Sequence, residues 1–139
     1  MGMDVYGCNP KNQAGEYFRA NVWSWRPIHE LMFKLGSDLI DERTFQLMGS
    51  NDGAGPKSAK VCNEMANRIE AWLKDNPGPL ELDMGDEPFC KVTENGQFVT
   101  EQMLQENPNL VTRSAYCTDE DHLREWIEFL RNCGGFKVH

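Results

Sequence analysis

The sequence lacks any long apolar run, and this absence limits the class of protein. No stretch approaches the roughly 20 apolar residues that a helix needs to span a bilayer, and the opening residues have neither the basic nor the apolar region of a signal peptide. We therefore expect a cytoplasmic protein that does not associate with membranes. The five cysteines form no C-x-x-C pair, which argues against a disulfide framework or a zinc ribbon and predicts reduced thiols.

Catalytic and metal-binding motifs are also missing. His29-Glu30 begins like the zinc motif H-E-x-x-H, but Phe33 stands where the second histidine is needed. No serine lies in a G-x-S-x-G sequence, and the acidic stretch 80–87 lacks the spacing of a calcium loop. We expect a non-enzymatic protein without metal or cofactor. A catalytic site would require His29 or His122 to converge with a carboxylate or a thiol in a cleft.

The composition is that of a globular protein, and its charge is unevenly placed. The chain has 139 residues, 40% of them hydrophobic and 26% charged, which suits one domain over residues 1–139. Acids and bases balance through residue 69, whereas 14 acids face 6 bases from residue 70 onward. This half should repel nucleic acid and attract basic surfaces. The candidate partner-binding residues lie in one acidic loop: Glu81, Asp83, Asp86 and Glu87.

Apolar residues at helical spacing predict four helices. We expect them from Pro27 to about residue 39, over 41–48, over 56–75, and from Thr118 to the Gly134-Gly135 pair. The last helix should pack against the 56–75 helix, because these are the two longest amphipathic segments. The predicted contact joins Leu123, Trp126, Ile127 and Leu130 to Met65, Ile69 and Trp72.

The remaining segments predict a small sheet. Residues 4–7 and 136–138 read as strands at the two ends of the chain. Asn95-Gly96 predicts a two-residue type I′ turn within a hairpin at 89–100, followed by a helical turn at 101–105 and an extended piece at 110–116. The expected fold class is α+β, with three to four helices on a small antiparallel or mixed sheet and one hairpin.

Two of the four tryptophans lie in one aromatic stretch. If residues 17–25 are extended, Tyr17, Arg19, Trp23 and Trp25 share a face. These rings can stack a nucleobase beside Arg26, or they can be core residues. Likewise, the glycine-rich loop 49–56 can hold a phosphate at a helix N-terminus, or it can be a plain turn between helices. The candidate ligand-binding residues are Trp23, Trp25, Arg26, Asn51, Asp52, Gly53 and Gly55.

Several short motifs together resemble a known group of proteins. They are the opening Met1-Gly-Met-Asp-Val-Tyr-Gly7, then Gly15-Glu-Tyr-Phe-Arg19, Val22-Trp23 and Trp25-Arg-Pro27, and the closing Cys133-Gly-Gly-Phe136. This pattern is similar to a set of short proteins of bacteriophages and bacteria that carry no assigned function. The resemblance implies a phage-like setting, where small acidic proteins often inhibit host defence by occupying a protein surface or sequestering a nucleotide signal.

Three hypotheses follow. The first is a phage-type inhibitor of a host defence system, such as a CRISPR effector, that docks through its acidic second half on a basic host protein and does not bind nucleic acid directly. The second is a nucleotide or small-molecule binding protein that uses the aromatic-arginine stretch and the glycine-rich loop. The third is an enzyme of unknown class.

Overall fold

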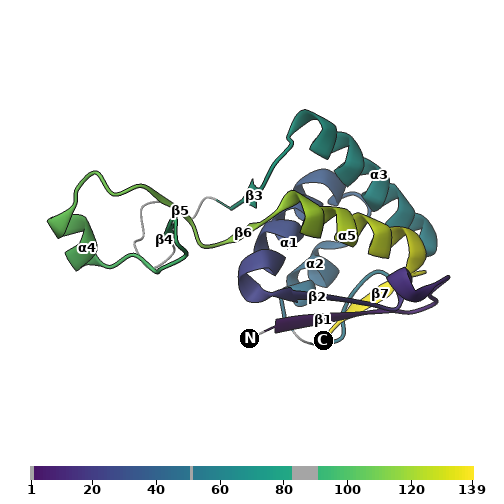
Figure 1. Cartoon of the computed structure of the whole chain (residues 1–139). Coiled ribbons are helices and arrows are strands. Elements are labelled where there is room, and N and C mark those ends of the chain that lie inside the picture. The colour runs from purple at the N-terminus through teal and green to yellow at the C-terminus, as the bar shows by residue number, and fades with distance from the viewer. Residues whose placement is uncertain (1, 51, 83–90) are drawn as a thin grey trace.

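Both ends of the chain lie in one antiparallel sheet, as predicted. The computed structural model describes residues 2–50, 52–82 and 91–139. β1 (Gly2–Gly7) is the central strand of this three-stranded sheet, and its neighbours are β2 (Tyr17–Asn21) and β7 (Phe136–Val138) (Figure 1). A short 3-10 helix, η1 (Gln13–Gly15), lies in the connection between β1 and β2.

The sheet has one buried and one solvent-facing side, because successive side chains of a strand point to opposite faces. The buried side carries Met3, Val5, Phe18, Ala20, Phe136 and Val138. The opposite side carries Tyr6, Tyr17, Arg19 and Lys137, which are all exposed. The strand register aligns Tyr6 with both Tyr17 and Lys137.

Helices cover the buried side and complete an α+β fold. They are α1 (Val22–Gly36), α2 (Glu42–Met48), α3 (Ala59–Asp75) and α5 (Glu120–Asn132). The predicted packing of the last helix against the third is confirmed, since α3 and α5 share an extensive contact. The predicted residues all belong to the resulting core, in which Trp72 is partly buried and the following are buried: Met65, Ile69, Leu123, Trp126, Ile127 and Leu130.

The prediction that the first helix begins at Pro27 is wrong. The strand ends at Asn21, whose side chain accepts a hydrogen bond from the Ser24 N–H and caps a helix that begins at Val22. Pro27 therefore lies inside the helix, where it cannot donate the usual bond to the carbonyl of Trp23. Residues 22–25 are helical, so the two tryptophans do not continue the face of the strand.

Two other predicted helix starts are shifted. The third helix begins at Ala59 rather than Pro56, because the Ser58 hydroxyl accepts from the Val61 N–H and caps it. The last helix is capped by Asp119, whose carboxylate accepts from the His122 N–H. Thr118, the predicted cap, belongs instead to a strand.

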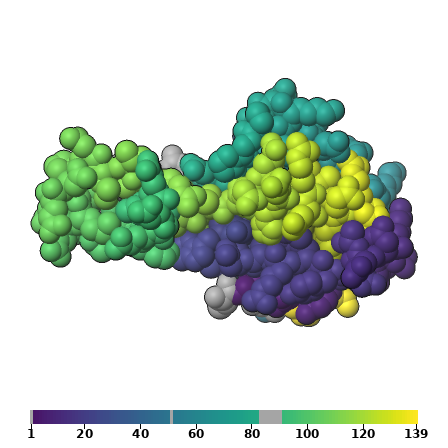
Figure 2. All heavy atoms as spheres, viewed as in Figure 1, coloured from purple at the N-terminus to yellow at the C-terminus, as the bar shows by residue number. Residues whose placement is uncertain are grey.

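A slender arm projects from this body of sheet and helices (Figures 1 and 2). We use "arm" for residues 91–116 and "neck" for the two-stranded ladder of β3 (Leu80–Glu81) and β6 (Cys117–Thr118). The arm contains three elements: β4 (Lys91–Thr93), α4 (Glu101–Glu106) and β5 (Thr112–Ser114).

The arm contributes nothing to the core of the body. Its buried side chains are only Val92, Val99 and Ala115, and α4 buries none. The chain reverses at Asn95-Gly96 as predicted, but the two-residue type I′ turn is wrong, because only Gly96 has a positive φ (82°). The returning segment pairs through a single Val92–Phe98 bridge, and β4 takes β5 as its strand partner. Residues 89 and 90 of the predicted hairpin lie outside the described residues.

Candidate functional site

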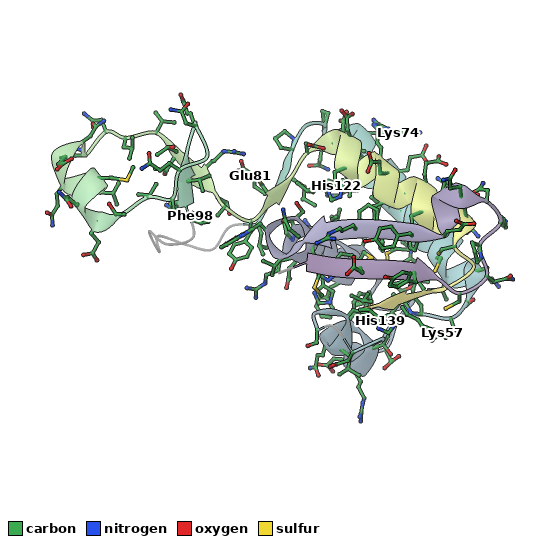
Figure 3. The ribbon with its side chains drawn as sticks, turned by 60° about the horizontal axis from the view of Figure 1, so that its bottom comes forward. Lys57, Lys74, Glu81, Phe98, His122 and His139 are labelled. Atoms are coloured by element: carbon green, nitrogen blue, oxygen red, sulfur yellow. The ribbon has the colours of Figure 1, made fainter. Side chains whose placement is uncertain are left out.

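An aromatic cluster fixes the base of the arm to α1. The Trp23 ring lies 4.6 Å from that of Tyr116 and 5.3 Å from that of Phe98 between centroids. The Arg26 guanidinium lies over the Tyr116 ring at 5.1 Å, in cation–π geometry. Figure 3 shows Phe98 at the base of the arm and Glu81 on the neck. Trp23 and Arg26 thus hold the arm against the body, and Phe98 remains 48% exposed.

The chain segment between the two neck strands concentrates the negative charge. Residues 80–118 include seven acids and two bases, or −5 of the net charge of −8. Glu81 is exposed on β3, as are the arm residues Glu94, Glu101 and Glu106. The other three acids of the predicted docking loop, Asp83, Asp86 and Glu87, lie outside the described residues.

The outer edge of β2 is open. Gly7 and Glu16 form a hydrogen-bonded pair through the Gly7 N–H, and bonded pairs alternate with non-bonded ones in an antiparallel ladder. The same alternation appears at Asp4, which turns its N–H and C=O to His139 beside β7. The backbone groups of Tyr17 and Arg19 therefore point away from β1.

The opposite edge of the sheet is covered by the glycine-rich loop. The Gly53 N–H donates to the Val138 carbonyl at 2.7 Å, and the Val138 N–H donates to the Ala54 carbonyl at 2.9 Å. Gly55 must lack a side chain, because a Cβ there would lie 2.3 Å from the Phe136 carbonyl oxygen. This loop pairs with β7 and does not open a helix, so the Gly53 N–H is not free to hold a phosphate. Asp52 is exposed, and Asn51 lies outside the described residues.

Two hollows follow the open edge of β2, where the strand faces α5. The first, of about 680 Å³, lies between β2, the neck and the start of α5, and the second, of about 670 Å³, continues along α5. Asp121 and Glu125 line both, and Glu128 lines the second. We call this continuous feature the β2–α5 groove.

The carboxylates of the groove have no counter-ion among the described residues. Asp121, Glu125 and Glu128 recur at spacings of four and three residues, so they form one stripe on α5. Three arginines line the same hollows, but each is directed to another group. Arg124 approaches Glu120 at 3.6 Å, Arg19 approaches Asp4 at 3.9 Å, and Arg113, on β5 of the arm, donates to the Cys117 sulfur at 3.4 Å. The stripe carboxylates therefore form no ion pair within the described part of the chain, and together with Asp119 they outnumber, by a small margin, the arginines of the groove.

His122 lies in the first hollow with Cys117 and Asp121, which is the convergence that an enzyme would require. However, both ring nitrogens are already engaged. Nε2 donates to the Arg19 carbonyl at 3.1 Å, and Nδ1 forms a hydrogen bond with the Thr118 hydroxyl at 2.7 Å. Figure 3 shows His122 between α5 and β2, and its imidazole links the two elements. Neither ring nitrogen is free to interact with the Cys117 thiol.

His29 has a structural role as well. Its Nε2 lies 2.5 Å from the Phe45 carbonyl, and its ring stacks on Trp25. Burial lowers the pKa of this imidazole below its ordinary value, although the Phe45 carbonyl opposes the shift. Because the Phe45 carbonyl can only accept, Nε2 carries the proton. The neutral imidazole of His29 therefore donates a hydrogen bond from α1 to α2.

Trp25 is a core residue, and the predicted stacking site built on it does not form. Its side chain is 1% exposed, and its Nε1 donates to the Met48 carbonyl at 2.9 Å. The Trp126 ring meets it edge-on at 5.3 Å. The helix that begins at Val22 turns Trp25 inward, whereas Tyr17 and Arg19 stay on the solvent-facing side of the sheet, as the period of two predicted.

The groove was not predicted from the sequence. Its acidic stripe was visible as acids at positions 121, 125 and 128 of a predicted amphipathic helix, but such acids usually mark a solvated face. The open edge of β2 had no local signal, because it depends on which segments cover the other strands.

The comparisons with known proteins give no relative. No protein-family model matches the chain, and no curated protein and no solved structure is significantly similar to it. Within the described residues, no helix combines the length and apolarity that crossing a bilayer requires. In the same residues, no group of three or more histidine, cysteine or acidic side chains is arranged to hold a metal ion.

Proposed function

We propose that the chain is a non-enzymatic binding protein that docks its acidic segment, residues 80–118, on a basic surface of a partner protein. The observation that carries the proposal is the arm itself. It projects from the body, lies within the segment that holds most of the net charge, and leaves Phe98 and Val111 48% and 63% exposed. The charge is the main support for docking, and the two exposed apolar side chains add area that a partner can bury.

The energetics of the arm support this proposal. Fully burying a valine contributes about 1.5–3 kcal/mol, and the arm buries only Val92, Val99 and Ala115. Ordering its backbone costs about 1–2 kcal/mol per residue. The arm therefore depends on the neck ladder and the Trp23 cluster, and a partner that covers Phe98 and Val111 adds the burial that the arm lacks.

The chemistry of the partner follows from the charge. A surface that binds nucleic acid is rich in lysine and arginine, and carboxylates can occupy it in place of phosphates. In the phage-like setting implied by the resemblance, we propose a host defence protein as the target, such as a nucleic-acid-binding subunit of a CRISPR effector. Occupying that surface would block access of nucleic acid and thereby inhibit the effector.

A pull-down with matched charge-reversal variants tests this function. The first variant converts the docking acids to lysine: Glu81, Asp83, Asp86 and Glu87. The second has the same net charge but carries its four lysines in place of exposed body acids: Glu16, Glu30, Glu42 and Asp52. Proteins captured from bacterial lysate are identified by mass spectrometry at increasing salt.

We expect one basic protein to be retained by the unmodified chain and by the body variant, and to be lost from the variant of the docking acids. Its retention should fall steeply with salt, since exposed charge pairs are screened over about 10 Å at 0.1 M ionic strength. Equal capture by both variants would remove the acidic segment from the proposal.

A second candidate function is the binding of a nucleotide on the solvent-facing side of the sheet. Tyr6 and Tyr17 are 46% and 44% exposed, their rings lie 5.3 Å apart, and Arg19 and Lys137 flank them. A base can stack on such a ring, at about 1–3 kcal/mol per base. The central Asp4 accepts from the Tyr17 hydroxyl and lies 3.9 Å from the Arg19 guanidinium, so Lys137 is the cation on this side that forms no ion pair among the described residues and can receive a phosphate.

A thermal-shift screen with mononucleotides and cyclic nucleotides tests the second candidate. Ligand at 100 times its dissociation constant stabilises a protein by about 2.7 kcal/mol. The shift should disappear in Tyr6→Ala and persist in Phe33→Ala, which removes a similarly exposed ring from α1. Absence of a shift with every nucleotide would reject this function.

A further inference from the structure

We propose that the β2–α5 groove binds an extended, lysine- or arginine-rich segment of the partner, which adds to the open edge of β2 as an antiparallel strand. This inference deepens the proposed function, on which it rests, by naming the second contact and its chemistry. It joins two independent features of the groove, namely the free backbone groups of β2 and the carboxylates of α5 that form no ion pair among the described residues.

The edge of β2 supplies the backbone contacts. Tyr17 offers its N–H and C=O, and Arg19 offers its N–H, whereas the Arg19 carbonyl is engaged by His122. Open edges are hazardous, and proteins usually cover them. Here the glycine-rich loop covers the β7 edge, and the space beside β2 stays hollow. A peptide that adds a strand to such an edge gains main-chain hydrogen bonds whatever its sequence.

The acidic stripe of α5 runs beside this edge. α5 and β2 are antiparallel neighbours, since His122 lies against Arg19, and a Cβ on Gly15 would lie 2.0 Å from the Asn132 carbonyl oxygen. Asp121 and Glu128 are about 10 Å apart along the helix, at 1.5 Å per residue. Alternate residues of a strand are about 7 Å apart, so two or three basic side chains of an added strand can face the stripe.

The geometry also fixes which residues of the added strand are basic. In an antiparallel pair, directly opposed residues have side chains on the same face. The partner residue that bonds to Tyr17 therefore shares the solvent-facing side, and its neighbours point to the other side, where α5 lies. These neighbours carry the positive charge, and their own N–H groups point away from β2.

The probe is the synthetic peptide Thr-Lys-Thr-Lys-Thr-Lys-Thr with a fluorescent label, and binding to the full chain is followed by anisotropy. One derivative is N-methylated at the threonines and the other at the lysines. We expect the threonine-methylated peptide to lose binding, because those N–H groups face β2, and the lysine-methylated peptide to bind nearly as well as the parent. The reverse order, equal binding of the two, or no binding of the parent would overturn the proposal.

A pair of matched variants tests the charge component. The groove variant combines Asp121→Asn, Glu125→Gln and Glu128→Gln. The control variant, which has the same net charge, combines Glu30→Gln, Glu42→Gln and Asp52→Asn at exposed positions of the body. We expect the groove variant to weaken peptide binding about tenfold or more and to reduce its salt dependence, because three lysines lose their partners. The control variant should stay within about twofold of the unmodified chain. Equal weakening by both variants would mean that peptide binding depends only on the net charge of the chain, and would overturn the proposal that the groove is the binding site.

The two proposals fail in different ways. If the peptide does not bind but reversal of the acids at 81–87 still abolishes capture of a basic protein, the acidic segment docks and the groove does not. If the peptide binds with the predicted methylation pattern but that reversal leaves capture intact, the groove is the binding site and the proposed role of the acidic segment is wrong.

Discussion

The two buried tryptophans should respond differently to the same conservative substitution. Trp126 is fully buried among Phe18, Trp25, Phe129 and Phe136, with ring centroids at 4.9–5.3 Å. Its indole Nε1 has no hydrogen-bond partner among the described residues. Trp25 is equally buried, but its Nε1 donates to the Met48 carbonyl. Phenylalanine removes the N–H at both sites, and only at Trp25 does this break a hydrogen bond.

The magnitudes follow from these surroundings. Trimming a buried tryptophan to phenylalanine loses contact area at both positions, at a cost of about 1–3 kcal/mol. Trp126→Phe also removes an unsatisfied buried donor, which recovers about 1–3 kcal/mol of desolvation cost. Trp25→Phe instead leaves the Met48 carbonyl without its donor, which adds about 1 kcal/mol or more. We expect Trp25→Phe to be the more destabilising by about 2–4 kcal/mol.

Urea unfolding monitored by far-ultraviolet circular dichroism measures this difference. The alanine variants are the controls, and we expect Trp25→Ala and Trp126→Ala each to lose about 3–5 kcal/mol, because both vacate a large volume in one core. Equal losses for the two phenylalanine variants, or a larger loss for Trp126→Phe, would refute the hydrogen-bond argument. A mild loss in Trp25→Ala beside a severe loss in Trp126→Ala would contradict the burial of Trp25.

Three further predictions concern single positions. Burial lowers the pKa of His29 below its ordinary 6.5, so the unfolded chain binds this proton more readily than the folded chain does. The contribution of His29 to stability should therefore be full above about pH 6.5 and decrease below it. In His29→Gln, the melting temperature should change less between pH 7 and pH 5 than it does in the unmodified chain. Gly15→Ala should cost about 3 kcal/mol or more in urea unfolding, since its Cβ would lie 2.0 Å from the Asn132 carbonyl oxygen, whereas Gln13→Ala, on the exposed turn beside it, should be nearly neutral. Asp41→Ala should lower stability by about 1 kcal/mol by uncapping α2, and Asp41→Asn should largely restore it.

The sequence by itself determined the elements whose signals are local. The apolar stripes within residues 56–75 and from Thr118 to the Gly134-Gly135 pair predicted two helices and their mutual packing, because each helix needs an apolar partner. The extended ends of the chain and the outward side chains Tyr17 and Arg19 followed from the period of two. The concentration of acids between residues 80 and 118 was also plain from the sequence.

The tertiary structure decided where those elements end and what they expose. Whether Trp25 is buried depends on Asn21, which can continue a strand or cap a helix. Asn21 caps the helix here, and Trp25 packs against Met48 and Trp126. The open edge of β2 exists because the loop at Gly53–Pro56, far away in the sequence, covers β7 instead. Strand order and edge exposure depend on contacts between distant segments, whereas periodicity and propensity are local, so the groove appears only once the chain is folded.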